Sequence, residues 1–420
     1  MFANVTEAIA WIENSHRFGE KTDLTRMRAC CRRLGDPQDA FRSIHVAGTN
    51  GKGSTANYLK NILHCAGYKT GVYTSPYVVS FNERIGIGDE YIPDGTVVKY
   101  ANFLHDLWDA YYAETGDSIT FFEIVTLMCF LWFRDEKVEW GVIEVGLGGL
   151  YDATNVILPE ASCITNINFD HMKQLGNTLE SIALNKLGIV KPYRPLYTTE
   201  DKEQLIPLFT MHCHEAHAPI AFIDAREAGD VAIGEATSFS WKGVRYDLGL
   251  AGAHQVKNAA LAIETIRGLA DRQAIAVTAR NIYDGLKRTT WPGRFEIFEH
   301  RIVLDGAHNI GAFETLRPAV AAVFPGKKVK CLFCMMKDKD HKAVIGLLDS
   351  FVDEFHFTAI DYHRVATAQE LYEESAHPRK FVHADFEAAF SNLRNLGEDE
   401  ILLVCGSLYF VSAIRRILVP

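Results

Sequence analysis

Residues 43–67 read SIHVAGTNGKGSTANYLKNILHCAG, an apolar run, a glycine-rich loop and an amphipathic segment in that order. The run from Ile44 to Ala47 predicts a short buried strand. The segment after the loop predicts a helix that ends at Gly67, because its apolar residues follow the i, i+3, i+4, i+7 spacing. These residues are Leu59, Ile62, Leu63 and Ala66.

The loop between this strand and this helix has the composition of a phosphate-binding site. Glycines let backbone N–H groups converge on one anion, the helix N-terminus adds partial positive charge, and Lys52 adds a full charge. The spacing departs from G-x-x-x-x-G-K-[ST], since Val46 stands at the first glycine position and Gly53 follows Lys52. A glycine-rich turn without function is the alternative. We predict an ATP site with contacts from Asn50, Gly51, Lys52, Gly53 and Ser54.

The composition excludes several classes of protein. A chain of 420 residues predicts two domains, and 48% hydrophobic with 23% charged residues is ordinary for globular proteins. The net charge of −10 disfavours a nucleic-acid partner. The N-terminus lacks the pattern of a signal peptide, and the apolar run Phe121 to Phe133 is too short to cross a membrane, so we expect a buried helix there. Nine scattered cysteines favour a cytoplasmic location.

Strands and helices alternate along the first two thirds of the chain. Further strands are predicted at Thr70 to Tyr73, Trp140 to Val145 and Cys163 to Ile167, with helical segments between them. This order predicts an α/β fold with a mostly parallel sheet, in which ligands bind beyond the carboxyl ends of the strands. Polar or glycine-rich segments follow these strands, so we expect them to converge on one edge: Gly48 onward, Thr74–Ser75, Glu144–Gly146 and Asp170–His171.

A domain boundary is predicted within RTTWPGRF, residues 288–295, where Pro292 and Gly293 are adjacent. Residues 1–293 then form an ATP-binding, P-loop ATPase-like domain. Residues 294–420 form a smaller Rossmann-like α/β domain. Its predicted strands cover 302–304, 329–333, 354–360, 380–382 and 401–404.

Several motifs together resemble the Mur ligase superfamily, and most closely the folylpolyglutamate synthase/dihydrofolate synthase family. They extend from the N-terminal helices to residue 410, so the resemblance covers nearly the whole chain. The motifs are HVAGTNGKGST (45–55), TSP (74–76), ERI (83–85), EVGLGG (144–149), DATN (152–155), DH (170–171), NKLGIVKP (185–192), GAHQVKNA (252–259), WPGRFE (291–296), LDGAHN (304–309), KDKD (337–340) and CGSLYF (405–410).

The resemblance implies an ATP-dependent amide ligase that adds L-glutamate to dihydropteroate, to folate, or to both, in folate biosynthesis and polyglutamylation. ATP would phosphorylate a carboxylate, and the amino group of glutamate would attack the acyl phosphate. Two Mg²⁺ ions would neutralise the crowded negative charges. The resemblance assigns Ser75 and Glu144 to one ion, and His171 and a carbamylated Lys186 to the other. It also makes Lys52, His171 and Lys186 catalytic.

The resemblance also assigns binding residues for the nucleotide and the pteroate. Asn258 would contact adenine, Arg294 the phosphates, and Asp305 with His308 the ribose and phosphates. Closure of the two domains would bring Arg294 onto ATP. The partners would be small molecules bound by a monomer. Pteroate contacts are implied for Asp23, Leu24, Thr25, Arg26, Thr120, Tyr151, Asp152 and Ala153.

Other interpretations remain open. The chain departs from the family at Tyr77 and Leu150, where His and Arg are usual, so the choice between dihydropteroate and folate is not decided. Another Mur-type ligase is less favoured, because only 47 residues precede Gly48 and its additional domain would not fit. A catalytically silent nucleotide-binding regulator would lack a metal ligand. We interpret the cluster 212–217 (HCHEAH) as a surface loop, and Cys331 and Cys334 as core residues.

Overall fold

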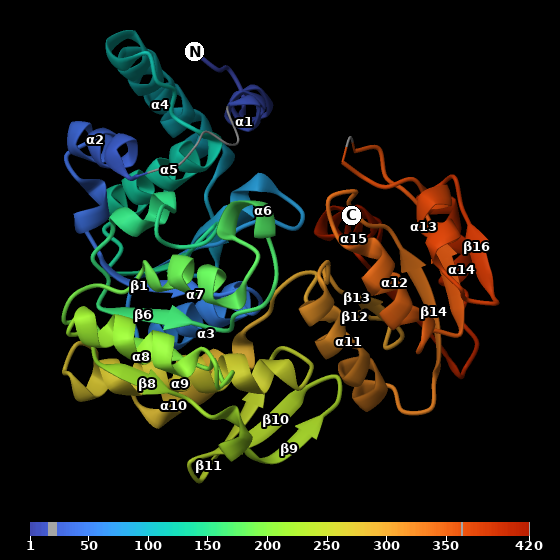
Figure 1. The fold of residues 1–420 in the computed structure, drawn as a ribbon. Coiled ribbons are helices and arrows are strands. Elements are labelled where there is room, and N and C mark those ends of the chain that lie inside the picture. Colours follow the sequence, from blue (N-terminus) through green and yellow to red (C-terminus); the bar gives the residue numbers. More distant parts are fainter. Residues whose placement is uncertain (16–22, 363, 420) are drawn as a thin grey trace. The chain divides into compact units, whose positions relative to one another are not determined.

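The computed structural model describes residues 1–15, 23–362 and 364–419 (Figure 1). Within it the chain forms two compact units. The first contains Met1–Ala225 and Asn258–Leu286, and the second contains Arg226–Lys257 and Lys287–Pro420. The division into domains 1–293 and 294–420 stays a prediction.

The first unit is built on an eight-stranded sheet with the order β4-β3-β2-β5-β1-β6-β7-β8. The six strands from β2 to β8 in this order are parallel, and β3 and β4 are antiparallel additions at one edge. The strands are β1 Arg42–Ala47, β2 Thr70–Tyr73, β3 Ile85–Ile87, β4 Glu90–Tyr91, β5 Trp140–Glu144, β6 Ala161–Ile164, β7 Leu196–Thr198 and β8 Ile220–Phe222.

Helices cover both faces of this sheet. On one face α5, α7 and α8 bury apolar side chains against the strands. On the other face α3 contacts β1, β2 and β5, and α9 reaches β6 through Thr265 and Cys163. The helices are α1 Val5–Asn14, α2 Thr25–Arg33, α3 Lys52–Cys65, α4 Asp94–Thr115, α5 Phe121–Asp135, α6 Met172–Leu175, α7 Leu179–Leu187, α8 Ile206–Glu215, α9 His254–Asp271 and α10 Ala279–Arg288. Short 3₁₀ turns are η1 Pro37–Asp39, η2 Phe81–Arg84, η3 Ala153–Val156 and η4 Ala225–Glu227.

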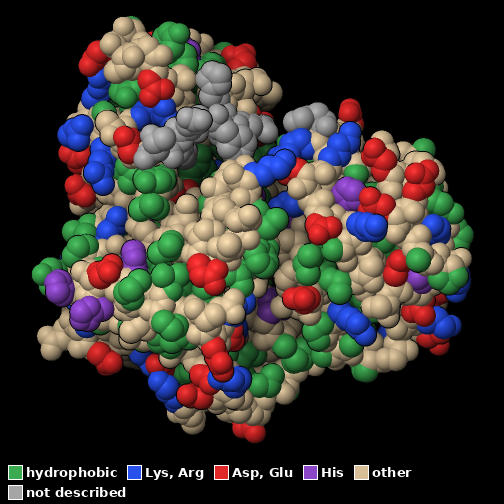
Figure 2. Space-filling model, in the orientation of Figure 1, with side chains coloured by type: hydrophobic (Ala, Val, Ile, Leu, Met, Phe, Trp, Pro, Cys, Tyr) green, Lys and Arg blue, Asp and Glu red, His purple; other side chains and the backbone are tan. Residues whose placement is uncertain are grey.

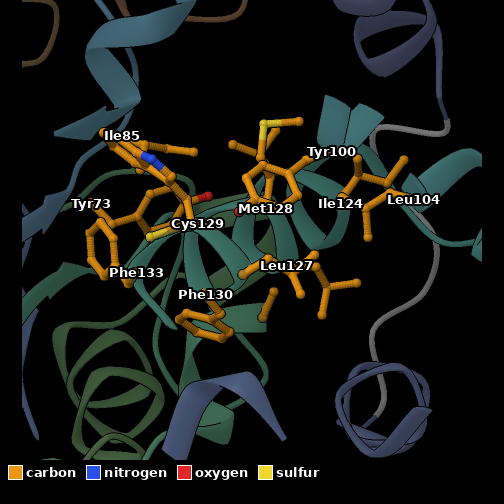
Figure 3. Close-up of a cluster of buried hydrophobic side chains, with 14 of the residues drawn as sticks. Tyr73, Ile85, Tyr100, Leu104, Ile124, Leu127, Met128, Cys129, Phe130 and Phe133 are labelled. Carbon is orange, nitrogen blue, oxygen red and sulfur yellow. The ribbon is translucent and has the colours of Figure 1, made fainter. Parts of the chain in front are cut away.

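The apolar run 121–133 is the centre of the largest core cluster, as predicted. Figure 3 shows its side chains packed between Tyr73 and Ile85 of the sheet and Tyr100 and Leu104 of α4. Close packing there requires small residues in the strands. A Cβ on Gly71 would lie 2.4 Å from the ring of Phe133, and one on Gly141 would lie 2.6 Å from Phe41. The helix is therefore a core helix of the first unit.

The second unit contains a six-stranded sheet with the order β12-β13-β17-β14-β15-β16 and a separate three-stranded sheet, β11-β10-β9. Only β12 runs antiparallel in the larger sheet. Helices α11–α13 pack on one of its faces and α14–α15 on the other. The elements are β9 Gly229–Ile233, β10 Thr237–Trp241, β11 Val244–Leu248, β12 Glu296–Phe298, β13 Ile302–Leu304, α11 Ile310–Val323, β14 Lys328–Phe333, α12 His341–Asp349, β15 Glu354–Phe357, α13 Ala368–Glu374, β16 Lys380–Val382, α14 Phe386–Leu393, β17 Glu400–Cys405 and α15 Leu408–Leu418.

The α/β class is confirmed, and so is the placement of Cys331 and Cys334 in the core. Three local predictions were wrong. The strand predicted over 354–360 ends at Phe357. The fourth strand ends at Ile164 and not at Ile167, because the next residues bind the phosphate loop. The cluster 212–217 begins on α8, where Cys213 is buried, so most of it is helix and not loop. Within the described ranges, none of the helices is both long and apolar enough to span a bilayer. Acidic and basic side chains are interspersed on the face drawn in Figure 2.

Candidate active site

Four loops of the first unit leave the sheet at adjacent strand ends, as the sequence predicts. In β5, Glu144 pairs with Val46 of β1, and Ile143 pairs with Tyr73 of β2. On the other side of β1, Ala47 pairs with Ile164 of β6. The segments beginning at Gly48, Thr74, Val145 and Thr165 therefore start side by side.

The phosphate loop has a backbone that only glycine accommodates at two positions. Gly48 and Gly51 have φ values of +144° and +84°. A Cβ on Gly48 would lie 1.8 Å from Oγ1 of Thr165, and one on Gly51 would lie 2.3 Å from Oδ1 of Asn258. Gly51 caps α3, so the first turn of this 14-residue helix opens directly onto the loop. The N-terminal N–H groups of a helix are a general binding site for anions.

The side-chain amide of Asn166 holds the phosphate loop by bonding both the N–H and the carbonyl of Asn50, as a neighbouring strand would. Its Oδ1 accepts the N–H of Asn50 at 3.1 Å, and its Nδ2 donates to the carbonyl of Asn50 at 2.9 Å. Thr165 Oγ1 donates to the same carbonyl at 2.6 Å, and the N–H of Thr49 donates to Asn166 O at 2.9 Å. The backbone of Thr49 and Asn50 is thus committed to the β6 loop. The N–H groups that can bind a phosphate begin at Gly51.

A buried carboxylate holds the segment 165–168 that binds the phosphate loop. Glu200, which follows β7, accepts the N–H of Ile167 at 2.6 Å. The carbonyl of Asn168 accepts the hydroxyl of Thr49 at 3.2 Å, and the N–H of Asn168 donates to that hydroxyl at 3.0 Å. Sequence reasoning missed Asn166, Asn168 and Glu200. The polar tetrad TNIN at 165–168, directly after an apolar strand, is the signal that could have found the first two.

Two lysines contact consecutive carbonyls of the phosphate loop. Lys186, on α7, donates to Gly48 O at 2.8 Å, and Lys52 donates to Thr49 O at 3.1 Å. Lys186 is only 5% exposed. Burial, and then the nearby charge of Lys52, lower the pKa of Lys186 to about 7, while Asp170 and Asp152 oppose this change. The structure therefore brings two of the predicted catalytic residues to one loop.

The predicted metal ligands Ser75 and Glu144 are adjacent. The N–H of Ser75 donates to Glu144 Oε2 at 3.1 Å, and Glu144 is 4% exposed. His171 caps α6 with a left-handed backbone (φ 51°), and its side chain is 46% exposed. In the part of the chain that the structure describes, no group of three or more His, Cys, Asp or Glu is arranged to hold a metal ion. Metal binding by these residues stays a prediction.

The segments predicted to bind pteroate meet through a residue that sequence reasoning missed, Glu123. Its Oε2 accepts Arg26 Nε at 2.9 Å and the hydroxyl of Thr120 at 2.8 Å. Thr120 is the N-cap of α5, and the T-x-x-E pattern of a capping box is the signal that identifies Glu123. Leu24 is the N-cap residue of α2. On either side of it, the side chain of Asp23 accepts the N–H of Thr25 at 2.8 Å. Helix α2 also contacts η3, which begins at Ala153.

Asp152 closes the second glycine loop. Its Oδ2 accepts the N–H of Leu147 at 3.0 Å, and its Oδ1 accepts the N–H and hydroxyl of Thr154 at 3.0 and 2.5 Å. Asn155 Nδ2 donates to the carbonyls of Leu150 and Gly188, both at 2.9 Å. The DATN segment therefore joins the glycine loop to the C-terminal end of α7, which carries Lys186. Tyr151 lies on the surface beside it, 40% exposed.

The remaining nucleotide predictions fall on α9 and on the second unit. Asn258, in the first turns of α9, is buried and faces Gly51. In the second unit, Asp305 follows β13 and accepts the N–H groups of Phe295 and Ala307, both at 2.8 Å. Burial raises the pKa of Asp305, while the nearby charge of Arg294 opposes this. The Nδ1–H of His308 donates to Gly306 O at 2.8 Å.

Comparison with known proteins gives consistent similarities. The middle domain of Mur ligases matches residues 46–266, and the Mur ligase glutamate ligase domain matches 293–408. The dihydrofolate synthase/folylpolyglutamate synthase of Bacillus subtilis is 35% identical, and the folylpolyglutamate synthase of Lacticaseibacillus casei is 32% identical, each over 99% of both chains. Escherichia coli FolC in complex with DHPP and ADP is 28% identical with a TM-score of 0.86, covering 99% of this chain and 98% of its own.

Proposed function

The chain belongs to the folylpolyglutamate synthase/dihydrofolate synthase family of Mur ligases, and from this premise we propose that it joins L-glutamate to both dihydropteroate and a reduced folate. The enzyme is an ATP-dependent ligase. A carboxylate oxygen of the acceptor attacks the γ-phosphorus of ATP, and ADP leaves. The amine of glutamate then attacks the acyl carbon, loses a proton, and expels phosphate with the original oxygen.

The observation that carries the use of ATP in this proposal is the phosphate loop with its two lysines. Its glycines cannot bear side chains, its carbonyls are held by Lys186, Lys52, Thr165 and Asn166, and α3 begins directly after it. A triphosphate would then meet the N-terminal N–H groups of the helix and the cation of Lys52. Similar proteins have been solved with ADP and with AMPPCP and folate, which supports the use of a nucleotide by this chain.

Magnesium would be held by single ligands from several loops. Carboxylate and hydroxyl oxygens suit this hard ion, so Glu144 and Ser75 fit one site, and His171 with a modified Lys186 the second. When bound, Mg²⁺ supplies charge neutralisation for the phosphates. Lys186 as an ammonium would repel a metal. With its pKa lowered to about 7, much of this amine is neutral at physiological pH. A neutral amine can attack CO₂, lose a proton and become a carbamate with anionic oxygens.

The pteroate would lie where α2, Thr120 and the DATN segment meet. Arg26 and Thr120 are joined there by Glu123, and Asp152 lies at the start of η3. We propose the segment 23–26 with Tyr151 and Ala153 as its further boundary, and Asn258, Arg294, Asp305 and His308 as the remaining nucleotide contacts. We also propose a monomer acting on small molecules in the cytoplasm, which suits nine scattered cysteines and a net charge of −10.

The test is an ADP-release assay with ATP, Mg²⁺ and L-glutamate, comparing dihydropteroate with tetrahydrofolate as acceptor. We expect glutamate-dependent ADP release with each acceptor, and none from a Lys52→Ala variant. Turnover with tetrahydrofolate but none with dihydropteroate at any concentration would refute the dual activity. Absence of glutamate-dependent release with both acceptors would refute the proposed function.

A further inference from the structure

His45 is a fully buried histidine in the centre of the first sheet. It lies on β1, three residues before Gly48, and is 0% exposed. Its Nε2 lies 2.8 Å from the hydroxyl of Thr154. Its Nδ1 has no hydrogen-bond partner among the described residues. Burial, with a smaller contribution from Lys191, lowers the pKa of His45 to about 3, so the ring is neutral at physiological pH.

Two hydrogen bonds link His45 through Thr154 to Asp152. The donor of each follows from the carboxylate of Asp152, which is the last acceptor. An ionised carboxylate only accepts, so the hydroxyl of Thr154 donates to Asp152 Oδ1 over their 2.5 Å separation. The oxygen of Thr154 must then accept from the imidazole. His45 is therefore protonated on Nε2, and its unpartnered Nδ1 is a bare acceptor.

This arrangement is costly for a residue with only a packing role. A buried acceptor without a partner loses its hydration and gains nothing in return. An apolar side chain of similar size would fill the same space without this penalty. The cost is understandable if the Nε2–H is needed to orient the hydroxyl of Thr154. Thr154 in turn directs a hydrogen bond at one oxygen of Asp152 and so fixes the plane of its carboxylate.

We propose that His45 and Thr154 are positioning residues that orient Asp152 toward an N–H donor of the pteroate heterocycle. Both positions on Oδ1 are taken by Thr154, and one on Oδ2 by the N–H of Leu147. A carboxylate has about four acceptor positions, which leaves one on Oδ2 that no described residue uses. Asp152 can therefore accept a single hydrogen bond in a fixed direction. This inference rests on the proposed function, because it takes Asp152 as a pteroate contact.

Two matched pairs of variants test the proposal. Thr154→Val removes the hydroxyl at nearly constant volume, whereas Thr154→Ser keeps it. His45→Leu removes the donor, whereas the amide of His45→Gln can place an N–H near the position of Nε2. We expect the KM for dihydropteroate to rise about tenfold in Thr154→Val and His45→Leu, with kcat and the KM for ATP within twofold of the parent. Thr154→Ser and His45→Gln should stay within threefold for all three constants.

Two further measurements separate positioning from folding. Combining Thr154→Val with Asp152→Asn should raise the KM for dihydropteroate no further than Asp152→Asn alone, because both act on one hydrogen bond. An additive effect, or equal rises in the KM for ATP and dihydropteroate with a lowered melting temperature, would overturn the proposal. If the parent binds dihydropteroate in calorimetry but does not turn it over, the proposed function fails. The variants of each pair are then compared by their dissociation constants for dihydropteroate instead of their KM values. The proposal would also be overturned if the two variants of each pair had the same KM for dihydropteroate.

Discussion

Removal of the Asn166 side chain should weaken ATP binding without unfolding the protein. In Asn166→Ala, Asn50 loses the acceptor of its N–H at 3.1 Å and one of the donors to its carbonyl at 2.9 Å. Each such bond contributes about 1 kcal/mol net, so the loop conformation loses about 2 kcal/mol. Since about 1.4 kcal/mol corresponds to a tenfold change, the Kd for ATP should rise roughly 30-fold.

Asn168→Ala is the matched control, because Asn168 lies two residues away and is partly buried like Asn166. Its contacts to Thr49 come from its own backbone and survive the substitution. Among the described residues, the side chain loses only a marginal 3.5 Å contact to Asn166. We expect its Kd for ATP to stay within twofold of the parent.

Calorimetric titration of both variants with a non-hydrolysable ATP analogue measures the effect, and thermal unfolding checks the fold. Thr165 still donates to the carbonyl of Asn50, so the melting temperature of Asn166→Ala should change little. The reasoning is refuted if Asn166→Ala binds the analogue like the parent. It is equally refuted if both variants lose the same affinity, because the Asn166 side chain would then have no special part in holding the loop.

Four further predictions concern individual side chains. Lys186→Ala should lose activity by orders of magnitude and recover part of it with formate or acetate, whereas Lys186→Arg should be inactive and not rescued; parental activity of either in the ADP-release assay would exclude a metal role. His45 has a folded pKa below its unfolded value, so its contribution to stability is complete above pH 6.5 and is lost as the pH falls toward 3. Urea unfolding at pH 7 and pH 5 should therefore show a loss about 2 kcal/mol larger for the parent than for His45→Gln, and equal losses would contradict the burial of a neutral ring. Gly116 has a φ of +70° and open space around its Cα, so Gly116→Ala should cost about 1 kcal/mol in urea unfolding. Gly51→Ala also displaces Asn258 and should abolish binding of the ATP analogue. Binding retained by Gly51→Ala would contradict the phosphate-binding role of the loop. Arg26→Ala leaves the buried carboxylate of Glu123 without its guanidinium and should cost about 3 kcal/mol in urea unfolding. Arg33→Ala loses an exposed pair with Glu114 and a contact with the ring of Tyr111, and should cost about 1 kcal/mol, so equal costs would show that burial does not matter here.

The sequence predicts the parts of this fold that depend on local pattern. The strand at Ile44–Ala47 and the helix ending near Gly67 follow from periodicity within a few residues, and both are confirmed. The convergence of four loops follows from the parallel order of the strands and is confirmed by the register of β1, β2, β5 and β6. These inferences need no knowledge of which side chains touch.

Contacts between distant segments could not be predicted in this way. The early end of β6 depends on Thr165 and Asn166 finding Asn50, and no pattern within 161–170 encodes that partner. Glu123 has a recognisable capping pattern, but its pair with Arg26 joins residues 97 apart in sequence. Thr154 lies within the DATN motif, but the motif does not identify its partners. Only the structure shows that its hydroxyl stands between His45 and Asp152.

The polar residues buried around the phosphate loop explain why its motifs are so widely spaced along the chain. The carbonyls of Gly48, Thr49 and Asn50 leave water on folding, and each must then be satisfied by a donor. The donors come from the helix α3 itself, from the β6 loop and from α7. The loop can therefore reach its binding conformation only after all three segments have packed. Removal of one of these donor side chains should therefore change ATP affinity more than global stability, because each of them holds the loop.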